Sequence, residues 1–337
     1  LGGATSFSLN GTNNGGIINS LASGSTVTLK DPSTTVTANI SNAVVSTGDV
    51  LNVVLSNDTA NTNAFGTITT AGTETVNITM TDAGTVNNVV ATTDTATLVA
   101  TSATTINVSG NNGLTLTTAG NTAVTTFDAS GVVADTATSD SAALLAVTYA
   151  SANVTATAAV AITGGAGNDV LTGAAAIDTI VGGAGNDQIT GGTGADTMTG
   201  GAGTFVIAGG DNTTAAHDVI TDYTAAAASG DTINMNGTAD IAEDETASAG
   251  VAAGVTITVV DGILTLGGTG ASSIDTLAEW IVEANATVDV NDESVAFEFN
   301  GDTYVYQQTN NAAGDLLVEL DGVTGITDMA AAAAANS

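Results

Sequence analysis

The sequence has no cysteine, one proline and a single basic residue, Lys30, among 337 residues. Without cysteine, no disulfide can hold the fold together, although small exported domains often depend on disulfides. With one cation against 34 acidic side chains, salt bridges cannot be a general source of stability. No segment approaches the roughly 18 apolar residues that a membrane-spanning helix needs. We therefore expect no insertion into a membrane.

The charge of the chain limits the kinds of molecule that it can bind. The formal net charge is −33 at pH 7, and such a field repels nucleic acid and anionic lipid head groups. The same field attracts divalent cations. Acidic residues usually form a solvated surface, but here the charged fraction is only 10% and many aspartates recur at fixed intervals. We therefore predict a metal-binding role and no nucleic-acid partner.

The remaining composition favours strands. Aromatic residues make up 3% of the chain and apolar residues 43%, which is too apolar for a disordered acidic chain. Thr, Ala, Gly, Asn, Ser and Val dominate, and this mixture suits short strands joined by tight turns. The sequence predicts an all-β fold, a parallel β-solenoid followed by a C-terminal β-rich domain with one short helix.

Four regions follow one another along the chain. Residues 1–72 contain short apolar strands without a fixed period, and both a β-sandwich and a solenoid are consistent with them. Residues 73–163 contain short strands separated by small polar turns, as expected of solenoid rungs that stack their apolar residues. Residues 164–210 form a sharper repeat. Residues 211–337 are predicted to be a C-terminal β domain.

The sharp repeat has a period of nine residues. Its first unit reads Gly164-Gly165-Ala166-Gly167-Asn168-Asp169-Val170-Leu171-Thr172, and four more units follow without interruption. Aspartate recurs at positions 169, 178, 187 and 196, and an apolar residue recurs two positions after each of them. The fifth unit keeps its glycines but has Phe205 where aspartate is expected.

Each unit divides into a six-residue turn and a three-residue strand. Glycine reaches positive φ without steric penalty and lets backbone carbonyl groups crowd around a cation. Calcium takes about six to eight oxygen ligands, more than one such turn offers. If two units make one coil, stacked turns lie 18 residues apart, which pairs Asp169 with Asp187 and Asp178 with Asp196. The spacing therefore predicts calcium ions between successive coils, with folding coupled to metal binding.

This block resembles the RTX (repeats-in-toxin) family, whose consensus is Gly-Gly-x-Gly-x-Asp-x-apolar-x and whose repeats form a parallel β-roll. The resemblance implies several Ca²⁺ ions held by aspartate carboxylates and by backbone oxygens of the turns. Ala174, Ala176 and Phe205 depart from the consensus. The candidate ligands are Gly164, Ala166, Asp169, Asp178, Gly182, Ala184, Asp187, Gly191, Thr193, Asp196, Gly200 and Ala202.

The C-terminal region carries local signals for two hairpins and a helix. Asp261-Gly262 and Asn300-Gly301 each separate two apolar runs, as in two-residue hairpins. Residues 274–281 have apolar side chains at helical spacing, with Ser272 or Ser273 as the expected cap and Trp280 near the buried face. Leu316–Leu320 is expected to add a further strand, and an alanine run, 330–335, closes the chain.

Catalytic motifs are missing from the sequence. It contains no HExxH zinc motif, no GxSxG elbow and no phosphate-binding loop, and its only histidine, His217, is expected to be structural or exposed. We therefore predict that the chain is not an enzyme.

The resemblance to RTX proteins implies two alternative functions. RTX proteins leave Gram-negative bacteria through a type I system that reads a C-terminal signal, expected here within residues 303–337. The long solenoid with its embedded calcium repeats is most similar to secreted, calcium-dependent surface-layer proteins, which would make copies of the chain itself and cell-surface polysaccharide its partners. The alternative is an RTX adhesin or the export module of a larger RTX exoprotein.

Overall fold

A computed structural model gives the fold and divides the chain into two compact units, residues 1–188 and 189–337. It describes residues 5–10, 16–30, 35–41, 47–57, 62–82, 93–118, 120–134, 142–207, 212–213, 216–224, 230–235, 240–241, 245–250, 252–288, 293–309, 315–327 and 329. No helix among these residues is long and apolar enough to cross a membrane.

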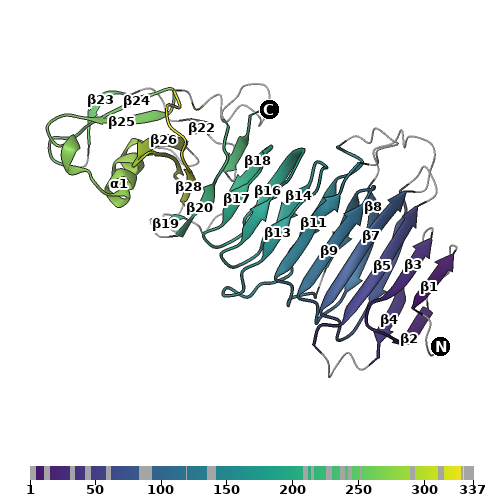
Figure 1. Cartoon of the computed structure of the whole chain (residues 1–337). Coiled ribbons are helices and arrows are strands. Elements are labelled where there is room, and N and C mark those ends of the chain that lie inside the picture. Colours follow the sequence, from purple (N-terminus) through teal and green to yellow (C-terminus); the bar gives the residue numbers. More distant parts are fainter. Residues whose placement is uncertain are drawn as a thin grey trace. The chain divides into compact units, whose positions relative to one another are not determined.

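The first unit is a solenoid of two parallel sheets, whose strands lie side by side in Figure 1. One sheet contains β1 (Ser6–Asn10), β3 (Ser25–Lys30), β5 (Val50–Asn57), β7 (Thr75–Asp82), β9 (Thr105–Gly110), β11 (Thr126–Val132), β13 (Ala161–Thr163) and β15 (Thr179–Val181). The other contains β2 (Gly16–Leu21), β4 (Val36–Ile40), β6 (Ala64–Thr69), β8 (Asp94–Val99), β10 (Leu114–Thr117), β12 (Val147–Ala150), β14 (Val170–Thr172) and β16 (Asn186–Thr190).

A column of buried apolar side chains runs through the first of these sheets. Each member lies beside the next in the register of neighbouring parallel strands, and each is at most 1% exposed. The column consists of Leu51, Val76, Ile106, Phe127, Ile162 and Ile180. Because β3, β5 and β7 belong to the same ladder, the first strands of the chain are solenoid rungs and not a sandwich.

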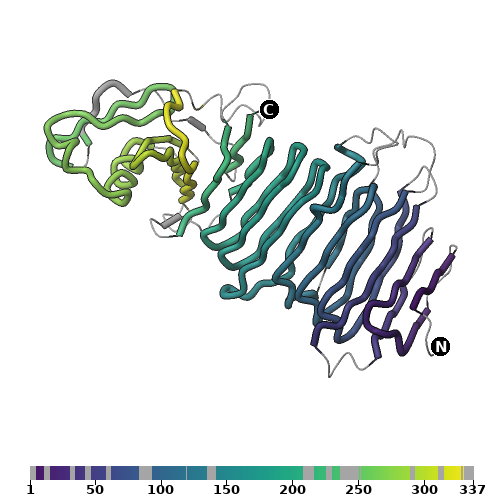
Figure 2. The backbone as a smooth tube through the Cα atoms, viewed as in Figure 1, coloured from purple at the N-terminus to yellow at the C-terminus, as the bar shows by residue number. Residues whose placement is uncertain are grey.

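The length of one coil changes along the solenoid. Asn52, Asn77 and Asn107 occupy one register position on β5, β7 and β9, at separations of 25 and 30 residues. Between β13 and β15, Ile162 lies beside Ile180, only 18 residues later. The tube in Figure 2 shows these successive coils. The 18-residue coil predicted from two nonapeptides per turn is therefore confirmed where the repeats lie.

The second unit begins with four strands that pair in parallel, β17 (Thr197–Thr199), β18 (Ala202–Ile207), β20 (Ala216–Ile220) and β21 (Thr232–Met235). β17 pairs with β20, and β18 pairs with β21, both in parallel. Its further elements are β19 (Asn212–Thr213), β22 (Asp240–Ile241), β23 (Glu245–Ala249), β24 (Thr256–Val260), β25 (Ile263–Gly267), a 3-10 turn (Ala271–Ser273), α1 (Leu277–Thr287), β26 (Glu293–Phe299), β27 (Asp302–Gln307) and β28 (Leu316–Leu320).

Both predicted hairpins are confirmed. β24 pairs antiparallel with β25 across Asp261-Gly262, and β26 pairs antiparallel with β27 across Asn300-Gly301, with positive φ at both residues of each turn. β28 adds the expected antiparallel strand beside β27. The alanine run 330–335 lies outside the described residues.

The helix is present, but its predicted cap is wrong. Thr276 is the N-cap of α1, and its hydroxyl accepts a hydrogen bond from Glu279 N–H while the Glu279 carboxylate accepts from Thr276 N–H. This reciprocal capping box satisfies two free amides, an advantage that Ser272 and Ser273 lack because neither has a Glu or Gln three residues later. Trp280 stacks on buried Phe297 with ring centroids 5.3 Å apart, as its expected position required.

Candidate metal centre

The first and third nonapeptide turns lie directly on one another. Asp187 Oδ1 accepts a hydrogen bond from Asp169 N–H at 2.8 Å, and Asn168 Oδ1 accepts one from Asn186 N–H at 2.9 Å. Ala184 N–H donates to the carbonyl oxygen of Gly165 at 3.0 Å. The structure thus brings together Asp169 and Asp187, the pair predicted from the 18-residue spacing.

Glycine leaves room for oxygen atoms between these turns. A β-carbon at Gly164 would collide with the carbonyl oxygen of Gly182 and with Asp169 Oδ2. A β-carbon at Gly182 would collide with Asp187 Oδ2. The first glycine of each turn therefore faces the carboxylate of its own repeat, and a side chain there would displace the oxygen atoms that a cation needs.

The two carboxylates are buried and differ in their hydrogen bonding. Asp169 Oδ1 accepts from Val147 N–H at 2.7 Å, and its Oδ2 accepts from Gly165 N–H at 2.6 Å. Asp187 Oδ1 is occupied by Asp169 N–H, but Asp187 Oδ2 has no hydrogen-bond partner among the described residues although Asp187 is only 2% exposed. A buried carboxylate oxygen without a donor is costly unless another group compensates it.

Burial also changes the acidity of this pair. Removal from water raises the pKa of Asp169 to about 6, against the lowering effect of its two backbone donors. Burial, together with the nearby negative charge of Asp169, raises the pKa of Asp187 to about 7, against the lowering effect of the Asp169 N–H donor. Both groups therefore resist carrying a negative charge in a dry, cation-free site, and a divalent cation would remove that penalty.

Asp178 occupies the corresponding place in the second repeat. It is fully buried, and its carboxylate accepts hydrogen bonds from Val160 N–H at 2.7 Å and Ala174 N–H at 2.9 Å. Val160 precedes Asp178 by 18 residues, so this aspartate also reaches the preceding coil. Its predicted pairing with Asp196 stays a prediction.

In the second unit, the fourth repeat follows the same rule and the fifth breaks it. Buried Asp196 lies against Gly191, where a β-carbon would collide with Asp196 Oδ2. At Gly200, a β-carbon would collide with the ring of Phe205, which is fully buried. Phe205 therefore fills with carbon the space that aspartate oxygens fill in the other repeats. The roles predicted for Ala166, Ala184, Thr193 and Ala202 stay predictions.

Two aspartates that follow the last repeat contact the turns of the fourth and fifth repeats, and the sequence reasoning did not include them among the candidate ligands. Asp218 Oδ1 accepts from Asp196 N–H at 3.0 Å, the same contact that Asp187 makes with Asp169. Asp222 accepts from Gly200 N–H and Gly201 N–H, at 2.9 and 2.7 Å. Because these acids lie outside the nine-residue period, only their order after the last repeat could have indicated them.

Comparison with known families agrees with this geometry. A family model for the RTX calcium-binding nonapeptide repeat matches residues 161–180 and 172–204, with four copies. The chain is an RTX-repeat protein. No curated protein matches it. RTX repeats bind Ca²⁺, so this chain is a calcium-binding RTX protein. Proteins that carry such repeats are generally secreted by the type I route.

The residues of the first and third RTX turns fit a calcium ion. Calcium is a hard cation that prefers carboxylate and carbonyl oxygens. Asp169 Oδ2, the Gly182 carbonyl oxygen and the donor-free Asp187 Oδ2 lie beside glycines whose missing side chains leave room. When bound, the ion supplies positive charge that compensates the buried carboxylates.

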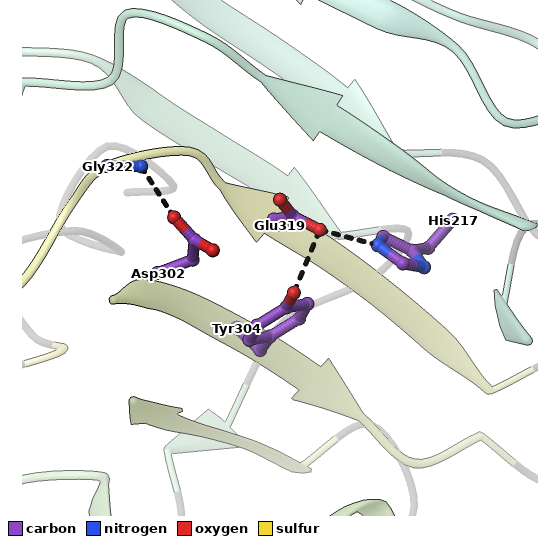
Figure 3. Close-up of polar contacts among 5 residues, drawn as sticks. All are labelled: His217, Asp302, Tyr304, Glu319 and Gly322. Carbon is purple, nitrogen blue, oxygen red and sulfur yellow. Dashed lines mark hydrogen bonds and ion pairs between the residues drawn. The ribbon is translucent and has the colours of Figure 1, made fainter. Parts of the chain in front are cut away.

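A second acidic cluster lies at the C-terminal strands, and Figure 3 shows two of its members, Asp302 and Glu319. Carboxylate oxygens of Asp302, Glu319 and Asp321 lie within 4.8 Å of one another. Glu319 Oε2 contacts His217 Nε2 at 2.8 Å and accepts from the Tyr304 hydroxyl at 2.9 Å. The His217–Glu319 contact connects β20 to β28, so His217 has a structural contact, one of the two roles expected for it.

Proposed function

We propose that this RTX-repeat chain is a calcium-stabilised structural protein that is secreted and assembles with copies of itself into a bacterial surface layer. The supporting observation is the apolar column from Leu51 to Ile180, because it joins the calcium turns to the long solenoid as rungs of one stack. A calcium module that serves only for export has no need of such a column.

The charge of the chain supports a role for calcium in assembly. Copies with a net charge of −33 repel one another in solution. Calcium bound in the turns lowers that charge and fixes the solenoid in one conformation, so assembly depends on the ion in two ways. Cell-surface polysaccharide is the expected anchor of the layer. The proposal gives the chain no catalytic role.

Electron microscopy of the purified chain tests the proposal. We expect ordered two-dimensional sheets in calcium and their loss in EGTA. Asp187→Asn should weaken assembly because it removes a buried carboxylate from the RTX turns. Asp128→Asn is the matched control, since it makes the same charge change at a half-buried position of strand β11. Single particles both with and without calcium would contradict self-assembly and favour the adhesin or export-module alternative.

A further inference from the structure

A cleft of about 560 Å³ lies among the C-terminal strands, at a place where two neighbouring strands separate. β25 and β26 run in parallel and, among the described residues, pair only at Ile263 and Ala296. Beyond this pair, β25 stays with β24 and β26 stays with β27, so the two strands diverge. The diverging part of β25 lines the cleft with Leu264, Thr265 and Leu266.

The lining of this cleft is mostly apolar. Trp280 stacks on Phe297 and also lines the cleft, and Val260 in the lining is 49% exposed. Among the described lining residues, Glu298 is the only charged one, and its carboxylate accepts a hydrogen bond from Gly325 N–H. A cleft without a cation does not suit an anionic ligand. Its aliphatic and aromatic walls suit an uncharged aliphatic group.

The solenoid presents aliphatic side chains of this kind along one edge. Residues 151–160 connect β12 to β13, and residues 173–178 connect β14 to β15. The two loops belong to neighbouring coils, because β12 pairs with β14 and β13 pairs with β15. Val154 in the first loop is 75% exposed, and Ile177 in the second is 65% exposed. We call these two side chains the apolar edge.

The apolar edge is not explained by the repeat, and it carries no exposed charge. Ile177 stands where the first and third repeats have Asn168 and Asn186, so the turn does not require an apolar residue there. Neither loop contains a charged side chain apart from Asp178, which is fully buried. Copies with a net charge of −33 can therefore approach each other at this edge without bringing exposed charges of these loops together.

We propose that the apolar edge of one copy inserts Val154 and Ile177 into the cleft of a second copy, beside Trp280. Each copy carries both surfaces, so the contact joins two different surfaces head to tail. Contacts of this kind extend from copy to copy into open arrays unless the rotation closes a ring. The inference deepens the proposed function, on which it rests, by naming one contact of the layer.

Two variants of the full chain, each with one surface intact, test the contact in calcium. The edge variant combines Val154→Asp with Ile177→Asn, and the cleft variant, Thr265→Glu, adds a charge at an exposed lining residue. At the lowest concentration that gives wild-type oligomers, each variant alone should sediment as one 32.4 kDa chain. An equimolar mixture should reach twice this mass and stop, because one matching pair of surfaces remains and cannot propagate.

Trp280 is the only tryptophan in the chain, so its fluorescence reports on the cleft directly. Its emission should shift to shorter wavelength when the two variants are mixed, because the inserted side chains exclude water from the ring. Vesicles of phosphatidylcholine are the competing probe. An emission shift with vesicles, combined with mixed variants that stay monomeric, would assign the cleft to an alkyl chain and overturn the inference.

Two controls place similar charges on exposed apolar residues elsewhere. Val133→Asp follows β11, where the chain crosses between the sheets in the opposite direction, and Val282→Glu lies on α1 outside the cleft lining. Both should behave as the wild type. A monomeric wild type, or variants that oligomerise alone, would overturn the inference. Sheets that form normally from the edge variant would overturn it while leaving the proposed function standing. Mixed dimers without any wild-type sheets would support it while removing the surface layer.

Discussion

Two regions of the same solenoid hold their coils together by different means. In β5 and β7, three inward positions per strand are buried and apolar, and an asparagine ladder runs across the outside. Asn77 donates to Asn52 at 2.8 Å, and Asn107 donates to Asn77 at 2.8 Å. In the RTX coils, β13 and β15 each bury one apolar residue, Ile162 and Ile180, beside turns that stack aspartates.

The difference follows from what the two side chains can do. An asparagine side chain donates and accepts, so a stack of asparagines satisfies itself. An ionised aspartate only accepts, so a stack of aspartates needs backbone donors and a cation. The early coils therefore depend on a thick apolar core and neutral amides, whereas we expect the RTX coils to depend on calcium.

The largest expected effect is a difference in calcium dependence between the apolar core of the early coils and that of the RTX coils. Ile78→Ala and Ile180→Ala each remove a fully buried side chain, and each should lower the free energy of unfolding by about 2–5 kcal/mol in calcium. In EGTA, Ile78→Ala should cost the same, but Ile180→Ala should cost little because its coil is already unfolded. Urea denaturation followed by circular dichroism measures both. Equal losses for Ile180→Ala with and without calcium would erase the contrast.

A buried aspartate in the early solenoid should respond to protons instead of calcium. Asp94 is fully buried and accepts from Asn63 N–H and from the Asn57 and Asn112 side chains. Burial raises its pKa from 3.8 to about 6, despite these donors. The folded state then binds the proton more tightly than the unfolded state, so the stabilisation is full below pH 4 and lost as pH rises through 6.

This shift corresponds to about 3 kcal/mol between pH 4 and pH 7. Urea midpoints over that range should show it in EGTA, as the difference between the wild type and Asp94→Asn. The variant should lack this part of the pH dependence. If the two proteins have parallel pH profiles, Asp94 is not the group responsible.

The smallest effect concerns the asparagine ladder. Asn77→Asp replaces a donor with a second acceptor opposite Asn52 Oδ1, and it should cost about 0.5–1.5 kcal/mol. Added calcium should not rescue the variant, because this position on β7 lies within a strand and not in a glycine turn. Thermal unfolding with and without calcium checks this, and rescue by calcium would show that an acid in the ladder can bind the ion without a glycine turn.

The sequence predicted the RTX coils well because their period is strict. A repeat of nine residues, taken two to a coil, placed Asp169 over Asp187. The early solenoid could not be assigned in the same way, because its coils of 25 and 30 residues have no common period. Its continuity is visible only in the register of Leu51, Val76 and Ile106.

Tertiary contacts explain the residues that were missed. Asp218 and Asp222 reach the fourth and fifth turns from β20 and the segment after it, at separations of 22 residues that do not match the repeat. The α1 cap was misplaced because Ile274, which precedes the helix, was counted in its apolar pattern, although only Thr276 has a partner, Glu279, for a capping box.

Hydrogen exchange measured by mass spectrometry, with calcium and with EGTA, tests the central claim most directly. In calcium, the strands from β5 to β15 should all be protected. In EGTA, residues 161–188 should lose their protection, while the strands from β5 to β9 keep theirs. Protection of residues 161–188 that is unchanged by EGTA would contradict the account, because their buried aspartates would then need no cation to stay folded.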